Sequence, residues 1–145
     1  MLYDKSYAVH QFELIKTCTY VDTDLAIYYE RNLGILQKDI FETVKVPKFE
    51  FERKDNVINC CIEFIKGDQL NQFTRQQYAK TIYQGLVLRC DSFGNQYSFK
   101  DFSPNNFIVC KATGDLYYVD LEAYDVFALD ERISYFFDRH GWKYK

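Results

Sequence analysis

Hydrophobic and polar positions in the first half of the chain follow two different periods. Residues 7–18 are rich in β-branched and aromatic side chains, and this composition predicts a strand. Over residues 23–39, apolar side chains recur at helical spacing behind a capping sequence, which predicts an amphipathic helix. Residues 46–51 and 56–65 are apolar runs separated by a polar turn, and they predict two further strands. The helical stripe consists of Leu25, Tyr29, Leu33, Leu36 and Ile40.

The same two periods continue in the second half. Helical spacing of apolar residues predicts a helix over residues 74–90 and a last short helix over residues 131–139. Residues 107–110 and 116–119 are short apolar runs on either side of a Thr-Gly-Asp turn and predict a β-hairpin. Residues 123–128 are apolar but show no period, so we expect them to be irregular. The whole pattern is that of an α+β protein.

Polar residues gather at one end of the expected hairpin. Asp101 and Asn106 lie in the loop before its first strand, and Asp120 and Glu122 follow its second strand. A hairpin brings these positions together, because the entry to the first strand lies beside the exit from the second. Carboxylate and amide oxygens gathered in this way suit Mg²⁺, which binds one or two carboxylates together with substrate phosphates. An ordinary hairpin with turn-forming Asp and Asn is the alternative.

The spacing Asp-x-x-x-x-Asn, followed by a strand, a turn and a strand that ends in Asp, resembles the catalytic and metal-binding loops of the protein-kinase-like superfamily. The version Asp-Phe-Ser-Pro-Asn-Asn-Phe-Ile-Val with Val-Asp-Leu-Glu is most similar to atypical bacterial branches, such as aminoglycoside phosphotransferases and lipopolysaccharide kinases. The resemblance implies ATP and Mg²⁺ as cofactors. It implies that Asp101 orients and deprotonates an acceptor hydroxyl. It also assigns the metal to Asn106, Asp120 and Glu122.

The N-terminal half extends the resemblance. A strand that carries Lys16, followed by a helix that carries Glu30, is the order found in kinases. The resemblance therefore assigns Lys16 to the nucleotide phosphates and Glu30 to the support of Lys16. A surface lysine and a solvated helix glutamate are the alternative.

Residues 62–67 read apolar-Glu-aromatic-apolar-x-Gly, which is similar to a kinase hinge. By that likeness Ile62 is the gatekeeper, and the backbone of Glu63 and Ile65 hydrogen-bonds adenine. An interior strand that ends in a Gly turn is the alternative. The implied fold is a single minimal kinase-like domain: a small antiparallel N-terminal sheet with one helix over about residues 1–65, and a truncated, mainly helical C-terminal lobe over residues 66–145.

Composition narrows the class of protein. The chain has 145 residues, 48% hydrophobic residues and a net charge of −3, which favours one folded domain without a basic patch for nucleic acid. No apolar run is long enough to span a bilayer and no signal peptide is evident, so we expect a cytoplasmic protein without a membrane partner. Five cysteines without metal spacing are expected to be reduced core residues rather than zinc ligands.

Two functions remain open at this point. The first is an ATP-dependent phosphotransferase that acts on a protein Ser/Thr, which we slightly favour, or on a small hydroxyl compound. The second is a pseudokinase that binds another protein, with a homo-oligomer as one form, and it is favoured by the missing Gly-rich loop and the many Tyr and Phe residues. So short a kinase-like chain suits a phage or bacterial protein. His10 and His140 have no partner visible in the sequence, and we expect no catalytic role for either.

Overall fold

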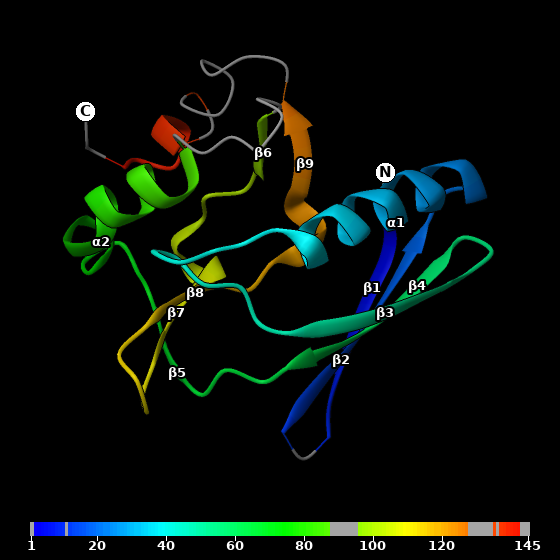
Figure 1. Cartoon of the computed structure of the whole chain (residues 1–145), viewed down its shortest axis with the longest axis horizontal. Helices are drawn as coiled ribbons and strands as arrows, with labels where there is room; N and C mark the ends of the chain where they lie inside the picture. Colours follow the sequence, from blue (N-terminus) through cyan, green and yellow to red (C-terminus); the bar gives the residue numbers. More distant parts are fainter. Residues whose placement is uncertain (1, 11, 88–95, 128–134, 136, 143–145) are drawn as a thin grey trace. The chain divides into compact units, whose positions relative to one another are not determined.

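The chain forms two compact units (Figure 1). The computed structural model describes residues 2–10, 12–87, 96–127, 135 and 137–142. Unit 1 consists of Met1–Lys38 and Pro47–Phe64, and unit 2 consists of Asp39–Val46 and Ile65–Lys145. The polypeptide therefore passes from one unit to the other three times, after residues 38, 46 and 64. Among the residues described, no helix is both long and apolar enough to cross a membrane.

Unit 1 is built on a four-stranded antiparallel sheet with the strand order β1-β2-β4-β3. Lys16 of β2 is paired with Tyr7 of β1 on one side and with Cys60 of β4 on the other. Asp55, in the turn between β3 and β4, has a φ of 55°, a left-handed conformation that Asp tolerates in tight turns. The strands are β1 (Leu2–His10), β2 (Glu13–Tyr20), β3 (Phe49–Lys54) and β4 (Val57–Glu63).

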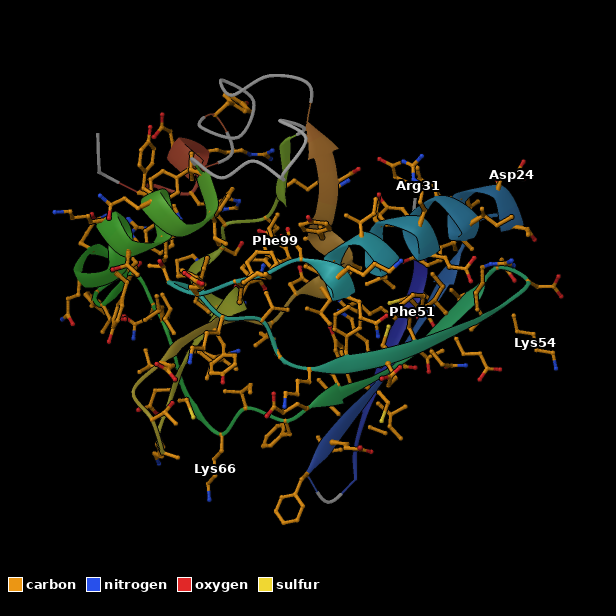
Figure 2. All side chains as sticks on the ribbon, viewed as in Figure 1. Asp24, Arg31, Phe51, Lys54, Lys66 and Phe99 are labelled. Carbon is orange, nitrogen blue, oxygen red and sulfur yellow. The ribbon has the colours of Figure 1, made fainter. Side chains whose placement is uncertain are left out.

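Helix α1 (Thr23–Lys38) packs on strands of this sheet (Figure 1). Its start is the N-cap that the sequence predicts, because Asp22 Oδ1 accepts a hydrogen bond from the backbone N–H of Leu25 at 2.8 Å. Figure 2 shows Phe51 of β3 on the side of the strand that faces α1, and Arg31 projecting from α1 away from the sheet. Ile40, expected in the apolar stripe, lies beyond the end of the helix and is 73% exposed.

The sheet of unit 1 buries alternate residues, and its edge strand β1 leaves apolar residues exposed. Along β2, Lys16, Cys18 and Tyr20 are buried, as the period of two in a strand requires. Tyr7 and Val9 of β1 are 55% and 60% exposed, although they carry large apolar surfaces. Further exposed apolar residues of this region are Phe12, Ile15 and Val21.

Unit 2 combines two small antiparallel sheets with helix α2 and with helical residues near the C-terminus. The first sheet has the order β5-β7-β8, and the second pairs β6 with β9. Helix α2 runs directly into the π-helical turn η1, and the 3-10 turns η2 and η3 lie on either side of the β7-β8 hairpin. The elements are β5 (Gly67–Gln69), α2 (Arg75–Ile82), η1 (Tyr83–Val87), β6 (Gln96–Phe99), η2 (Pro104–Asn106), β7 (Phe107–Cys110), β8 (Leu116–Tyr118), η3 (Leu121–Ala123) and β9 (Tyr124–Phe127).

Segment 39–46 joins unit 2 through its pairing with strand β8. Lys45 forms a parallel bridge with Tyr117. Its backbone N–H donates to the carbonyl of Leu116, and its carbonyl accepts from the N–H of Tyr118, each at 2.8 Å. The Lys45 ammonium donates to Asp115 Oδ2 at 3.0 Å. This segment thus supplies an additional edge to the sheet.

The core of unit 2 contains a cluster of aromatic rings, here called the aromatic cluster. Phe99, labelled in Figure 2, stacks on Tyr118 with the ring centroids 3.8 Å apart. Trp142 stacks on Phe137 at 5.5 Å, and Phe102 meets the ring of Phe137 edge to face at 5.7 Å. Every member is 3% exposed or less, and such rings contribute a large share of core burial. The cluster consists of Phe99, Phe102, Phe107, Tyr118, Tyr124, Phe137 and Trp142.

The structure confirms the mixed α+β class and corrects three details. Residues 7–18, expected as one strand, contain the turn between β1 and β2. The sequence does not reveal this turn, because no Gly, Pro, Asn or Asp marks it. Residues 123–128, expected to be irregular, include β9, whose partner β6 is too distant in sequence to leave a local signal. The described part of unit 2 contains strands β5 to β9, so it is not mainly helical.

Two expected helices lie only partly within the described residues. The helix expected over residues 74–90 corresponds to α2 and η1 as far as residue 87, and the rest lies outside the described residues. Of the helix expected over residues 131–139, residue 135 and residues 137–139 are helical.

The contact between β5 and β7 leaves no space for a side chain at Gly67. A Cβ built on Gly67 would lie 1.9 Å from the carbonyl oxygen of Val109. We therefore expect Gly67→Ala to lower the free energy of unfolding by about 1–3 kcal/mol, because backbone must move to admit the methyl group. Urea unfolding followed by far-UV circular dichroism measures the change.

Gly34→Ala is the matched control, because a Cβ on Gly34 in α1 would meet only Phe51 Cζ, at 3.9 Å. Alanine favours a helix interior over glycine by about 1 kcal/mol, so this variant should gain stability. Equal stability of Gly67→Ala and the natural protein would contradict the close approach of the two strands.

Candidate functional site

The candidate site is organised by the loop that connects β6 to η2. Phe99 and Phe102 belong to the aromatic cluster and are completely buried, whereas Asp101 between them is only half-buried. Asp101 Oδ1 accepts a hydrogen bond from the backbone N–H of Ser103 at 3.0 Å. The loop then enters η2, where Pro104 occupies the first turn. Burial of the two flanking rings therefore fixes the backbone of Asp101 and leaves its carboxylate accessible.

Asn106 connects the loop to the far end of the hairpin. Its Nδ2 is 3.4 Å from the carbonyl oxygen of Asp101 and 3.4 Å from Asp120 Oδ2, and it donates to both. Its backbone carbonyl accepts from the N–H of Val119 at 2.9 Å, which extends the pairing of β7 with β8. Asp101, Asn106 and Asp120 thus meet in one small volume, as the hairpin in the sequence predicts.

Tyr118 supports the same loop from inside unit 2. Its hydroxyl donates to the backbone carbonyl of Asp101 at 2.8 Å, and the residue is completely buried. Burial, followed by repulsion from Asp120, Asp101 and Glu122, raises the pKa of Tyr118 well above its ordinary value. The hydroxyl therefore keeps its proton and remains a donor, and the three carboxylates lie close enough to act on it.

The pKa of the Asp101 carboxyl lies below its ordinary value. Partial burial is the largest single influence and acts in the opposite direction. Hydrogen bonds from Ser103 and Asn106, together with His140 nearby, outweigh the burial. Asp101 is therefore ionised at neutral pH and can accept a proton.

His140 is a residue of the site that the sequence did not indicate. Its Nε2 lies 3.4 Å from Asp101 Oδ1, and both side chains are partly exposed. The two residues are far apart in the chain, and nothing in the local pattern around His140 points to Asp101. Only the folded path of the C-terminal segment brings them together.

Asp120 and Glu122 supply further oxygen atoms on the same side of the hairpin. Asp120 lies two residues after the end of β8, and Glu122 lies in η3 and is half-buried. Within the described ranges, no group of three or more His, Cys, Asp or Glu side chains is arranged to hold a metal ion. The Asn106 amide nitrogen donates to the Asp120 carboxylate, so the two side chains are neighbours, and each also carries an oxygen of the kind that Mg²⁺ takes when phosphates complete its coordination.

The residues assigned to phosphate binding lie in unit 1. Lys16 is 3% exposed, so it is not a surface lysine, and its ammonium lies 5.4 Å from the centre of the Tyr7 ring. Glu30 Oε1 accepts a hydrogen bond from Arg53 Nε at 2.9 Å, a partner that the sequence did not indicate. The pairing of Lys16 with Glu30 stays a prediction.

The expected hinge residues lie at the end of β4 and beyond it. Ile62 is buried within β4, and Ile65 is buried at the start of the second stretch of unit 2. The backbone N–H of Glu63 donates to the carbonyl of Lys48 at 2.8 Å. Any backbone contact of Glu63 with adenine therefore has to use its carbonyl. The adenine contact itself stays a prediction.

Comparisons with known proteins add no family. The chain matches no protein-family model. A search of curated proteins finds no relative either. The kinase-like resemblance consequently depends on the sequence pattern alone.

The hydrogen bond from Tyr118 to Asp101 can be tested by removing a single atom. We expect Tyr118→Phe to lower the free energy of unfolding by about 0.5–1.5 kcal/mol, because the ring remains and one buried hydrogen bond is lost. Chemical unfolding monitored by Trp142 fluorescence and by circular dichroism measures this change. Tyr7→Phe, at an exposed tyrosine of β1, is the control and should change stability by less than about 0.5 kcal/mol. Equal losses in the two variants would contradict a supporting role for the Tyr118 hydroxyl.

Proposed function

We propose that the protein is an ATP- and Mg²⁺-dependent phosphotransferase of the protein-kinase-like fold that phosphorylates a hydroxyl group. One observation carries the proposal: the side chain of Asn106 donates to the backbone of Asp101 and to the carboxylate of Asp120. These three residues are the ones that the kinase-like pattern assigns to base and metal chemistry. An ordinary hairpin turn does not require an Asn that joins two acidic segments.

Asp101 is assigned the role of catalytic base. Its carboxylate is ionised and half-exposed, and one of its oxygens is held by the N–H of Ser103. In this role Asp101 orients an acceptor hydroxyl and takes its proton as the oxygen attacks the γ-phosphorus. The bond from γ-phosphorus to the bridging oxygen breaks, and ADP leaves. Positioning and charge supply most of the rate in such a reaction.

Asn106 and Asp120 are assigned to hold Mg²⁺, with Glu122 as an additional ligand. The hydrogen bond from Asn106 Nδ2 to Asp120 Oδ2 supports this assignment in that it makes the two side chains neighbours, and the amide oxygen of Asn106 would be the metal ligand. When bound, the metal neutralises charge on the phosphates. The chain contributes oxygen donors at the end of a short, hydrogen-bonded hairpin, where their spacing is fixed by the pairing of β7 with β8.

The nucleotide is assigned to four residues of unit 1 and to Ile65, where the second stretch of unit 2 begins. Lys16 would neutralise phosphate charge with the support of Glu30, and Ile62, with the backbone of Glu63 and Ile65, would contact adenine. Burial of Lys16 supports a specific role, because a buried ammonium is costly unless other groups compensate its charge. The acceptor would be a protein Ser/Thr or a small hydroxyl compound, and the protein would act in the cytoplasm, where ATP is supplied.

A second candidate is a pseudokinase that acts as a protein-interaction module. The specific observation in its favour is the exposed apolar surface of β1 and its turn, where Tyr7, Val9 and Phe12 are 55%, 60% and 85% exposed. Exposed apolar residues that lie together are typical of surfaces that bind another protein. A homo-oligomer would be one form of such binding.

Phosphate transfer from γ-labelled ATP tests the proposal directly. The purified chain should transfer label to itself or to a protein in a bacterial lysate when Mg²⁺ is present, and EDTA should stop the transfer. We expect Asp101→Asn and Asp120→Asn each to lower the rate by about 100-fold or more, because each removes a charge from the reacting site.

Asp115→Asn is the matched control. Asp115 is an acid of the same hairpin whose partner is Lys45, and it lies outside the proposed site. This variant should keep its transfer rate within about twofold of the natural protein. If the natural protein transfers no phosphate and shows no thermal shift on adding ATP and Mg²⁺, the phosphotransferase proposal is overturned. The protein-interaction module is then the remaining candidate.

A further inference from the structure

The C-terminal segment of the described chain is tied to α2 and to the Asp101 loop by three hydrogen bonds. Arg75 Nη1 donates to the carbonyl of His140 at 2.9 Å. Gln76 Nε2 donates to the carbonyl of Gly141 at 3.1 Å. Trp142 Nε1 donates to the carbonyl of Phe102 at 2.7 Å. Donors from α2 and an acceptor in the loop therefore hold the chain at His140 and at the two residues after it.

The turn at Gly141 suits glycine for two reasons. Gly141 has a φ of 81°, in the left-handed region that side chains disfavour. A Cβ at this position would also lie 2.8 Å from Arg75 Nη2. The backbone of the turn consequently approaches the Arg75 guanidinium closely, and this approach places the carbonyl of His140 within reach of Arg75.

Trp142 anchors the end of the segment in the aromatic cluster. Its ring stacks on Phe137 and meets the ring of Phe107 edge to face, and it is 3% exposed. Phe107 begins the strand that follows Asn106, so the same rings pack beneath the proposed site. The position of His140 is thus set by buried contacts, although its own side chain is partly exposed.

This arrangement brings a ring nitrogen of His140 to the oxygen of Asp101 that already accepts from Ser103. Ser103 N–H lies 3.0 Å and His140 Nε2 lies 3.4 Å from Asp101 Oδ1. A hydrogen bond from Ser103 and the His140 contact on the same oxygen together restrict rotation of the carboxylate about its Cβ–Cγ bond. The other oxygen, Oδ2, is then held in one direction.

We propose that His140 is a positioning residue that fixes the Asp101 carboxylate, so that Oδ2 faces the acceptor hydroxyl. The inference rests on the proposed function, because it gives a role to the proposed base. His140 does not itself touch the reacting atoms in this role. It acts through Asp101, and the contacts of Arg75, Gln76 and Trp142 act through His140.

The kinetic test compares His140→Ala with His140→Gln in Mg²⁺-dependent ADP formation and self-labelling. We expect His140→Ala to lower kcat by about 10- to 100-fold while the KM for ATP stays within about twofold, because misplacement of a reacting group slows the chemical step. His140→Gln carries an N–H donor of similar reach and should recover most of kcat. Arg139→Gln, at an exposed neighbour in the same segment, is the matched control and should behave as the natural protein.

A second variant tests the anchoring of the segment. Trp142→Phe keeps an aromatic ring in the cluster but removes the N–H that donates to Phe102. It should lower kcat, as His140→Ala does, again with little change in the KM for ATP.

A kcat for His140→Ala equal to that of the natural protein, or a loss that appears only in KM, would overturn the positioning role.

A measurement without nucleotide separates this inference from the proposed function. The amide proton of Ser103 donates to the same Oδ1, so its chemical shift in a ¹H–¹⁵N correlation spectrum reports on that oxygen. We expect a shift of the Ser103 signal in His140→Ala and a return toward the original position in His140→Gln. The same spectra show that each variant is folded.

The two failures then differ. If the natural protein transfers no phosphate, the proposed function is overturned, and a Ser103 shift in His140→Ala still supports the contact of His140 with Asp101. If transfer occurs but Ser103 is unmoved and kcat is unchanged in His140→Ala, only the positioning role is overturned.

Discussion

Burial of Phe99 and Phe102 on either side of Asp101 is the constraint on which the rest of the candidate site depends. Both rings are completely enclosed in the aromatic cluster, so the chain between them has little freedom to move. The acid is therefore presented by a backbone that hydrophobic packing holds in place. The side chains of Asn106 and Tyr118 then both donate hydrogen bonds to the backbone carbonyl of Asp101.

What the sequence predicts correctly depends on neighbours that are close in the chain. The cap of α1, the β3-β4 pair and the β7-β8 hairpin arise from local periods and turn residues, and the hairpin alone suffices to bring Asn106 to Asp120. Contacts between distant segments leave no such signal. The pairing of β6 with β9, the bond of Glu30 to Arg53 and the approach of His140 to Asp101 depend on how the whole chain packs, so sequence reasoning missed them.

Unit 1 presents a contrast between its two sheet edges. At the β1 edge, aromatic and aliphatic side chains remain exposed, and the unpaired backbone groups of an edge strand can accept a further strand. At the β3 edge, charged residues alternate along the strand, as in Glu50, Glu52 and Lys54, a pattern that discourages such pairing. The same sheet therefore carries one protected edge and one edge suited to contact, whichever function the chain performs.

The three passages of the chain between the units bear on how the protein can be divided and how it folds. Segment 39–46 lies between two stretches of unit 1 in the sequence, yet it forms the additional edge beside β8 through Lys45. A fragment that begins at residue 65 would therefore lack part of its own sheet, and a fragment that ends at residue 64 would carry an unpaired segment. During synthesis on the ribosome, segment 39–46 can pair with β8 only after β8 has been synthesised. Contacts of this sequence separation slow folding. Unit 2 therefore cannot complete its sheet until the stretch of unit 1 at residues 47–64 has also been synthesised.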